Sequence, residues 1–169
     1  MARVVLGIDP GIASTGFGVV SSQPGRLAAL EGDVIETDAG DRLELRLAQI
    51  GQRIEQLVTV HVPDALAVED IFFGRNVQTA FAVGQARGVV LAAAARHGVR
   101  CFAYTPQAIK LAVCGSGSAG KEQVQRMVGV LLGLESPPGS DHVADALAVA
   151  ICHGHGEPAR IAREAAAGA

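Results

Sequence analysis

Residues 3–37 read RVVLGIDPGIASTGFGVVSSQPGRLAALEGDVIET, a run of mostly apolar and small residues interrupted by two proline–glycine pairs. Arg3–Asp9 is nearly all apolar, which is typical of a central strand buried on both faces. Pro10-Gly11 predicts a turn, and two further strands follow it at Thr15–Ser21 and Arg26–Thr37. The charges of the third strand place it at an edge. Three successive strands with short connections predict an antiparallel meander.

The rest of the chain alternates predicted helices with short strands. In chain order we expect a helix opening at Asp41, a strand at Ala65–Glu69, a helix at Asn76–His97, a strand at Val99–Tyr104, a short helix from Pro106, and helices at Lys121–Leu132 and Asp141–His153. This order is similar to that of the ribonuclease H-like fold. The sequence therefore predicts an α/β protein whose mixed five-stranded sheet carries helices on both faces. We expect one domain over residues 1–156 and a disordered, Ala-rich tail over 157–169.

Composition excludes several classes of protein. A chain of 169 residues that is 49% hydrophobic and 18% charged is neither disordered, coiled-coil nor collagen-like. The longest apolar run, Val89–Ala95, is too short to span a membrane, and Val4–Ile8 is too short for a signal-peptide core. The three cysteines form no C-x-x-C pair, which favours reduced thiols. We expect a cytoplasmic protein without a membrane segment.

Charge is distributed unevenly along the chain. The total is −3, but residues 70–130 hold seven basic side chains and two acids, a net charge of +5, so the remainder carries −8. A positive face beside a separate acidic site suits a metal-dependent nuclease, although solvated surface helices produce the same count.

Two carboxylates stand at the ends of predicted strands. Asp9 ends the first strand and Glu69 ends the fourth, and these strands are neighbours in a sheet of this order. Like charges placed together are costly to ionise without a counter-charge, so the pair suggests a bound cation. The alternative is that each carboxylate merely caps a turn.

The last predicted helix supplies further ligands. His142 and Asp145 are spaced i, i+3 on one face, and Asp141 stands i, i+4 from Asp145. Four ligands of this kind can hold two divalent ions about 3.5–4 Å apart, one activating water and one stabilising the leaving oxygen. The chemistry that this predicts is phosphodiester hydrolysis by in-line attack.

Four motifs now carry a specific resemblance. They are Gly7-Ile8-Asp9-Pro10-Gly11, Glu69 followed by Phe72, Gly84-Gln85-Ala86-Arg87-Gly88, and Asp145-Ala146-Leu147-Ala148. In their order and spacing they resemble the RuvC family of Holliday junction resolvases, over about residues 4–155. The resemblance implies a homodimeric endonuclease of DNA recombination and repair that nicks opposed strands of a four-way junction. It also implies dependence on Mg²⁺, with Mn²⁺ as a substitute, and coupling to the branch-migration helicase complex.

The family's catalytic quartet maps onto Asp9, Glu69, His142 and Asp145, which we take as both catalytic and metal-binding. The third position is an aspartate in many members, and here Asp141 stands one residue earlier. Anchoring on Asp145 assigns the position to His142. Asp141 then has an ordinary role in the first turn of its helix, where an acid complements the macrodipole.

Four residues are predicted to bind DNA. The resemblance implies phosphate contacts for Lys110 and Lys121, which flank a glycine-rich loop, and base stacking for Phe72. Arg75 belongs to the same basic stretch. The alternatives are ordinary surface lysines and a phenylalanine in the core, to which we assign Phe73.

Small residues recur along the long predicted helix. A groove formed by Ala80, Gly84, Gly88 and Ala92 is our candidate dimer interface, because it lets another backbone approach closely. Close packing against the protein's own sheet is the alternative.

Two other functions stay open at this point. Gly7–Gly11 also resembles the phosphate loop of actin/Hsp70-like ATPases, which fold two such domains around a nucleotide, whereas 169 residues accommodate one. A non-catalytic junction-binding module is the third possibility.

Overall fold

The computed structural model describes residues 2–70 and 77–167, with side chains described for 2–70 and 78–156. Phe72 and Arg75, two of the predicted DNA-binding residues, and Phe73 lie outside the described residues. In the described part of the chain, no helix is long and apolar enough to cross a membrane.

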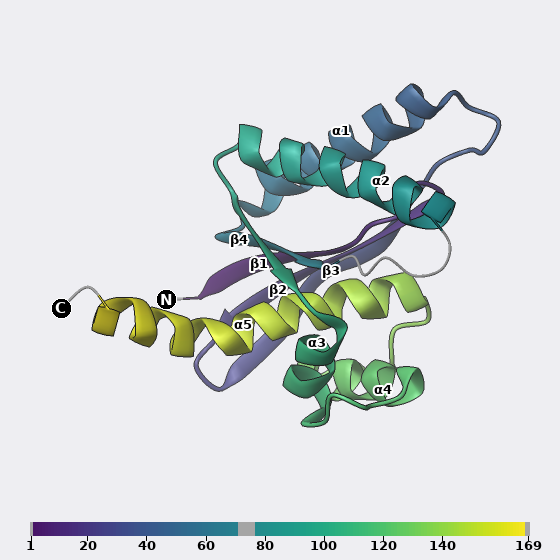
Figure 1. Ribbon diagram of the computed structural model, residues 1–169. Helices are drawn as coiled ribbons and strands as arrows, with labels where there is room; N and C mark the ends of the chain where they lie inside the picture. The colour runs from purple at the N-terminus through teal and green to yellow at the C-terminus, as the bar shows by residue number, and fades with distance from the viewer. Residues whose placement is uncertain (1, 71–76, 168–169) are drawn as a thin grey trace.

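A five-stranded mixed sheet lies at the centre of the protein (Figure 1), in the order β3-β2-β1-β4-β5. β1 pairs antiparallel with β2, and β2 with β3, whereas β1, β4 and β5 run parallel. The predicted meander, the edge position of the third strand and the adjacency of the first and fourth strands are confirmed. The strands are β1 (Arg3–Asp9), β2 (Ser14–Gln23), β3 (Arg26–Glu36), β4 (Ala65–Glu69) and β5 (Arg100–Tyr104).

Helices cover both faces of the sheet, as Figure 1 shows. α1 and α2 pack over one face, and α3, α4 and α5 lie against the other. Each face has its own buried core, one around Leu6 and Ile54, the other around Val5 and Ile151. The helices are α1 (Leu43–His61), α2 (Val77–Arg96), α3 (Pro106–Cys114), α4 (Lys121–Leu132) and α5 (Asp141–Ala167).

Three predicted helix ends are wrong, one of them by a single residue, since α2 ends at Arg96 rather than His97. α1 begins at Leu43 rather than Asp41, because Arg42 has an extended backbone and occupies the N-cap position. α5 continues to Ala167, past the predicted end at His153 and through the segment that was expected to be a disordered tail. The tail consists largely of alanine, arginine and glutamate, which favour helix strongly enough to extend one that has already formed.

Glycines let α5 lie directly on β1 and β2. A Cβ atom on Gly7 would overlap the carbonyl oxygen of Ala146, and one on Gly16 would overlap the carbonyl oxygen of His142. Only glycine allows backbones to approach so closely. The contact brings the first turns of α5 over the ends of β1 and β2, where the predicted site residues lie.

The small-residue stripe of α2 does not pack against the sheet. Gly84, Gly88 and Ala92 are exposed, and a Cβ on either glycine would meet no described atom within 4 Å. Phe81, one turn away on the same helix, is 68% exposed. The interpretation of the stripe as a contact with the protein's own sheet is therefore wrong.

Candidate active site

The ends of two parallel strands bring the first two predicted carboxylates to the same edge of the sheet. β1 and β4 pair in register up to Ile8 and Val68, and the next residue of each strand is Asp9 or Glu69. Both side chains are half-buried. Successive side chains of a strand point to opposite faces, so paired positions share a face. Asp9 and Glu69 therefore lie next to each other, as the sequence predicts.

The beginning of α5 adds an imidazole to this edge. The Nδ1 atom of His142 lies 2.7 Å from Oδ2 of Asp9. The side chain of His142 is 50% exposed and that of Asp9 is 21% exposed, so solvent reaches the pair. The contact uses one atom of each group, and each residue keeps a second nitrogen or oxygen that can bind an ion.

Burial, and after it repulsion by neighbouring carboxylates, raises the pKa of two of these acids. Burial raises the pKa of Glu69 above its ordinary value, and the charges of Asp145 and Asp9 raise it further, while Lys110 lowers it. Burial also raises the pKa of Asp145, with Asp9 as the next cause. Three acids within electrostatic range of one another, two of them costly to ionise, form a site that a divalent cation would stabilise.

The donor set has the chemistry that Mg²⁺ or Mn²⁺ requires, since both ions prefer carboxylate oxygens and Mn²⁺ also accepts imidazole nitrogen. The donor side chains are not yet arranged around one ion position. Among the described residues, no three His, Cys, Asp or Glu side chains are close enough together to hold one ion. Asp9 contacts His142 instead, so these side chains have to rotate to share an ion.

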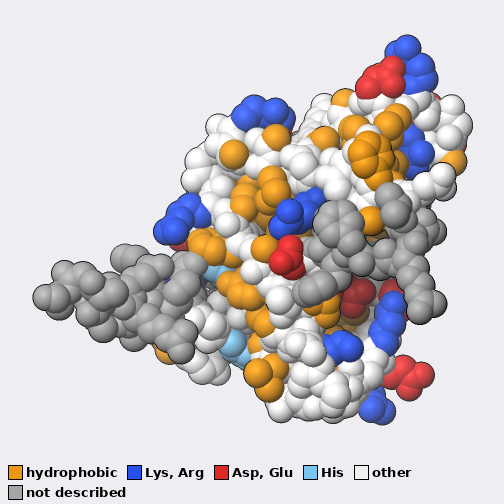
Figure 2. All heavy atoms as spheres, in the orientation of Figure 1, with side chains coloured by type: hydrophobic (Ala, Val, Ile, Leu, Met, Phe, Trp, Pro, Cys, Tyr) orange, Lys and Arg blue, Asp and Glu red, His pale blue; other side chains and the backbone are white. Residues whose placement is uncertain are grey.

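Both predicted lysines lie beside the acids. A hollow of about 210 Å³ opens between α3, α4 and α5, and Glu69, Asp145, Lys110 and Lys121 all line it. Its remaining wall is mostly apolar and consists of Pro106, Ile109, Val124 and Ala148. Figure 2 shows acidic side chains recessed among basic ones on this side of the molecule. A phosphate that approached the acids would thus meet two ammonium groups.

Asp141 faces a different group from its neighbour His142. Its Oδ2 atom lies 2.8 Å from Nζ of Lys121, and its Oδ1 atom accepts a hydrogen bond of 3.2 Å from Gln125. The hydrogen bond with Lys121 is the main reason that the pKa of Asp141 is lowered and that of Lys121 is raised. Asp141 is therefore engaged by α4, and His142 is the residue of this pair that contacts Asp9.

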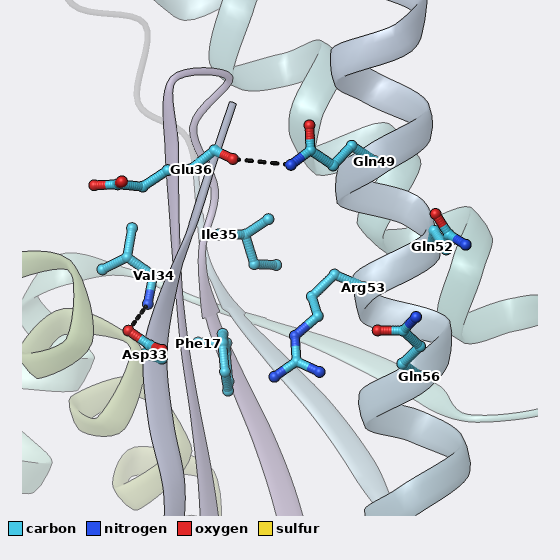
Figure 3. A pocket seen from close by; sticks show the side chains of 9 residues that line it. All are labelled: Phe17, Asp33, Val34, Ile35, Glu36, Gln49, Gln52, Arg53 and Gln56. Carbon is cyan, nitrogen blue, oxygen red and sulfur yellow. Dashed lines mark hydrogen bonds between the residues drawn. The ribbon is translucent and has the colours of Figure 1, made fainter. Parts of the chain in front are cut away.

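A second, larger hollow lies away from the acids. It measures about 300 Å³ and opens between the edge strand β3 and α1, as Figure 3 shows. Gln49, Gln52, Arg53 and Gln56 line its helical side. The Nε2 atom of Gln49 donates a hydrogen bond of 3.0 Å to the carbonyl oxygen of Glu36, which links α1 to the edge strand. None of the predicted catalytic residues reaches this hollow.

Sequence reasoning missed residues that support the site. Gln125 donates to both Asp141 and the carbonyl oxygen of Pro138, and so ties α4 to the beginning of α5. Thr15, which is fully buried beside the turn after Asp9, was interpreted only as part of a strand. Its hydroxyl, directly before the apolar and small residues 16–20, was a usable signal. Gln125 had none, because its partners become neighbours only in the folded chain.

Comparison with known proteins gives a consistent result. A family model described as crossover junction endodeoxyribonuclease RuvC matches residues 5–153. The chain is 51% identical over 165 residues to the crossover junction endodeoxyribonuclease RuvC of Moorella thermoacetica, which covers 98% of this chain and 99% of the relative. It is 50% identical over 151 residues to that of Syntrophomonas wolfei, with 89% of this chain and 88% of the relative covered.

Solved structures agree. The fold superposes on Thermus thermophilus RuvC with a TM-score of 0.87 and 40% identity, covering 95% of this chain and 97% of the other. For T. thermophilus RuvC in complex with a Holliday junction substrate, the TM-score is 0.86 and the identity 37%, with 93% and 96% of the chains covered.

Proposed function

The chain belongs to the RuvC family of crossover junction endodeoxyribonucleases, and from this premise we propose that it resolves Holliday junctions at the sheet edge where Asp9 and Glu69 meet the beginning of α5. It is a metal-dependent nuclease with a ribonuclease H-like fold. The main support for this location is the contact between His142 and Asp9, which are 133 positions apart in the chain. Beside them lie Glu69 and Asp145, whose pKa values are raised.

The four predicted residues Asp9, Glu69, His142 and Asp145 would hold two Mg²⁺ ions per subunit, and Mn²⁺ can replace them. Bound ions of this kind activate a water molecule and stabilise the leaving oxygen of a phosphodiester. The protein supplies donors from three elements that are far apart in the chain. Burial of Glu69 and Asp145 keeps water from screening their charges, which strengthens their attraction for cations.

Lys110 and Lys121 would bind the phosphates next to the scissile bond. Both line the hollow that contains Glu69 and Asp145. Lys121 is 61% exposed, and its flexible side chain can leave Asp141 to follow a phosphate. Phe72 and Arg75 complete the proposed DNA contacts. Their assignment rests on the sequence, since neither lies within the described residues.

We further propose that the protein acts as a homodimer. A four-way junction is nearly two-fold symmetric, and a C₂ pair of subunits can make two symmetric cuts. The exposed stripe of Gly84, Gly88 and Ala92, with Phe81 at its side, supports α2 as the interface. Coupling to a branch-migration helicase complex and a cytoplasmic location belong to the same proposal. A cytoplasmic location agrees with a DNA substrate and with cysteines that are free thiols.

The alternatives are less well supported. An actin/Hsp70-like ATPase would need a second domain, and the curated relatives that match nearly the whole chain are nucleases. A non-catalytic junction-binding module would have no need of acids whose ionisation is made costly by burial and by one another.

The decisive experiment uses a synthetic four-way junction. The wild-type protein should nick it in Mg²⁺, and Asp9→Asn should bind it without nicking. Asp33→Asn is the matched control, because Asp33 lines the hollow beside α1, away from the acids, and should leave nicking unchanged. ATP hydrolysis without nicking would favour the ATPase. Junction binding by the wild-type protein without nicking would favour the binding module.

A further inference from the structure

The turn that follows Asp9 is held by a buried side chain of the next strand. The hydroxyl of Thr15 accepts a hydrogen bond of 3.3 Å from the N–H of Gly11 and donates one of 2.5 Å to the carbonyl oxygen of the same residue. The Thr15 residue is completely buried. Both backbone groups of the residue two positions after Asp9 are therefore bound by one hydroxyl.

A second threonine holds the other half of the turn. The hydroxyl of Thr37 donates a hydrogen bond of 2.6 Å to the carbonyl oxygen of Ile12, and its N–H donates one of 3.0 Å to the carbonyl oxygen of Ala13. The Nε atom of Arg46, on α1, donates a 2.8 Å hydrogen bond to the Thr37 hydroxyl. A chain of hydrogen bonds thus connects α1 with the turn.

These bonds take up the carbonyl oxygens of three consecutive residues, Gly11, Ile12 and Ala13. The turn cannot shift without breaking some of them. Asp9 directly precedes this turn, so the position of its backbone, from which the carboxylate must reach the other ligands, depends on the turn. Sites of this kind depend on ligand positions held to about 0.5 Å, and residues outside the ligand set commonly hold them.

We propose that Thr15 and Thr37 are positioning residues for the Asp9 carboxylate, acting through the backbone of residues 10–13. Neither hydroxyl is a ligand in this proposal, because both are engaged by the turn. The inference rests on the proposed metal site, and it adds that the affinity of that site for divalent ions depends on two threonines outside the ligand set.

The test measures Mn²⁺ binding to the full-length, DNA-free protein by titration calorimetry, together with the Mn²⁺ concentration that half-activates junction nicking. Thr15→Val keeps the shape of the side chain and removes the hydroxyl. It should weaken Mn²⁺ binding about 10-fold or more, as loss of such supporting bonds does in other metal sites. Thr15→Ser restores the hydroxyl and should bind Mn²⁺ nearly as the wild type does. Thr37→Val should change affinity in the same direction, and Thr37→Ser should restore it.

Thr59→Val is the matched control. It removes a threonine hydroxyl on α1 that donates a hydrogen bond of 2.8 Å to the carbonyl oxygen of Glu55, away from the turn. The variant should therefore leave Mn²⁺ affinity unchanged. Folded Thr15→Val protein with wild-type affinity would overturn the inference. If that variant does not fold, unchanged affinity in Thr37→Val, whose side chain is only half-buried, overturns it instead. Equal Mn²⁺ binding by wild type and Asp9→Asn would defeat the proposed metal site itself.

Discussion

The Nδ1 atom of His142 lies 2.7 Å from Oδ2 of Asp9 and so joins the first turn of α5 to the end of β1. The preceding residue, Asp141, lies 2.8 Å from Lys121 instead. Successive residues of a helix differ in direction by about 100°, so these two neighbours serve different parts of the site. One faces the acids of the sheet, and the other faces the lysine at the start of α4.

Neutralising a crowded acid should stabilise the metal-free protein. The pKa of Glu69 and of Asp145 is raised in the folded state. Such groups stabilise the fold fully below the ordinary carboxyl pKa, and this contribution is lost as the pH rises through the raised value. Glu69→Gln and Asp145→Asn should therefore raise Tm by a few degrees at pH 7 in chelator, and the gain should vanish near pH 3.

Asp141→Asn provides the contrast for this measurement. The pKa of Asp141 is lowered, chiefly by its hydrogen bond with Lys121, so neutralising it should not raise Tm at pH 7. Scanning calorimetry at both pH values checks the pair of expectations. A lower Tm for Glu69→Gln and Asp145→Asn at pH 7 would show that their charges are not in conflict.

The imidazole should influence which metal is preferred. An imidazole ligand favours Mn²⁺ relative to Mg²⁺ more than a carboxylate does. We expect His142→Asp to lower the ratio of the nicking rate in Mn²⁺ to that in Mg²⁺, while Asp141→Asn leaves the ratio unchanged. Rates measured under single-turnover conditions with each ion test this. Equal rates in both ions, unaffected by His142→Asp, would remove His142 from the ligand set.

Lys121 should contribute to cleavage more than to binding. Loss of a charge that stabilises the reacting phosphate costs about 10²-fold or more in rate, whereas loss of one exposed contact among many weakens binding only modestly. Lys121→Ala should show this difference in single-turnover nicking and in junction binding with Ca²⁺. Asp141→Asn, which keeps the lysine and breaks only an exposed ion pair, should retain most activity. Full activity of Lys121→Ala would contradict a catalytic role.

Gly16 should be intolerant of a single methyl group. Its added Cβ would overlap the carbonyl oxygen of His142 and push α5 away from β2. We expect Gly16→Ala to lower the free energy of unfolding by about 1–3 kcal/mol. Its nicking rate should fall further than this loss of stability alone would explain, because the displaced helix carries site residues. Gly156 lies on α5, where an added Cβ would meet no described atom within 4 Å, so Gly156→Ala should leave stability unchanged or raise it. Urea unfolding and nicking assays compare the two, and native activity in Gly16→Ala would show that α5 can shift freely.

The α2 stripe should control association. A leucine at Gly88 finds open space within the subunit, so Gly88→Leu should fold normally and yield monomers that bind junctions poorly. Gly88→Ala, which adds one methyl group, should remain closer to the wild-type state. Light scattering coupled to size exclusion measures both. An intact Gly88→Leu dimer would move the interface away from α2.

Much of the fold could be predicted from the sequence, because the bounds of many strands and helices depend on residues close together in the chain. The bounds of β1, β4 and α4 match the structure residue for residue. β1 and β4 are short apolar runs that end in a carboxylate, whereas α4 is an amphipathic helix with a glycine directly before it and another directly after it. The meander was also local, because its turns are short. The predicted end of α5 at His153 is wrong, because the alanine, arginine and glutamate residues beyond it have high helix propensity and can extend a helix that has already formed.

By itself, the sequence determined which side chains reach the sheet edge where we propose the active site. A strand that ends in Asp9, a neighbouring strand that ends in Glu69, and the i, i+3 spacing of His142 and Asp145 follow from chain order and from the periods of strand and helix. Only the tertiary structure decided that His142 contacts Asp9 while Asp141 contacts Lys121. It also decided that the α2 stripe faces solvent. Periodicity defines the faces of a helix, but the rotation of that helix against a sheet depends on close contacts with residues far away in the chain.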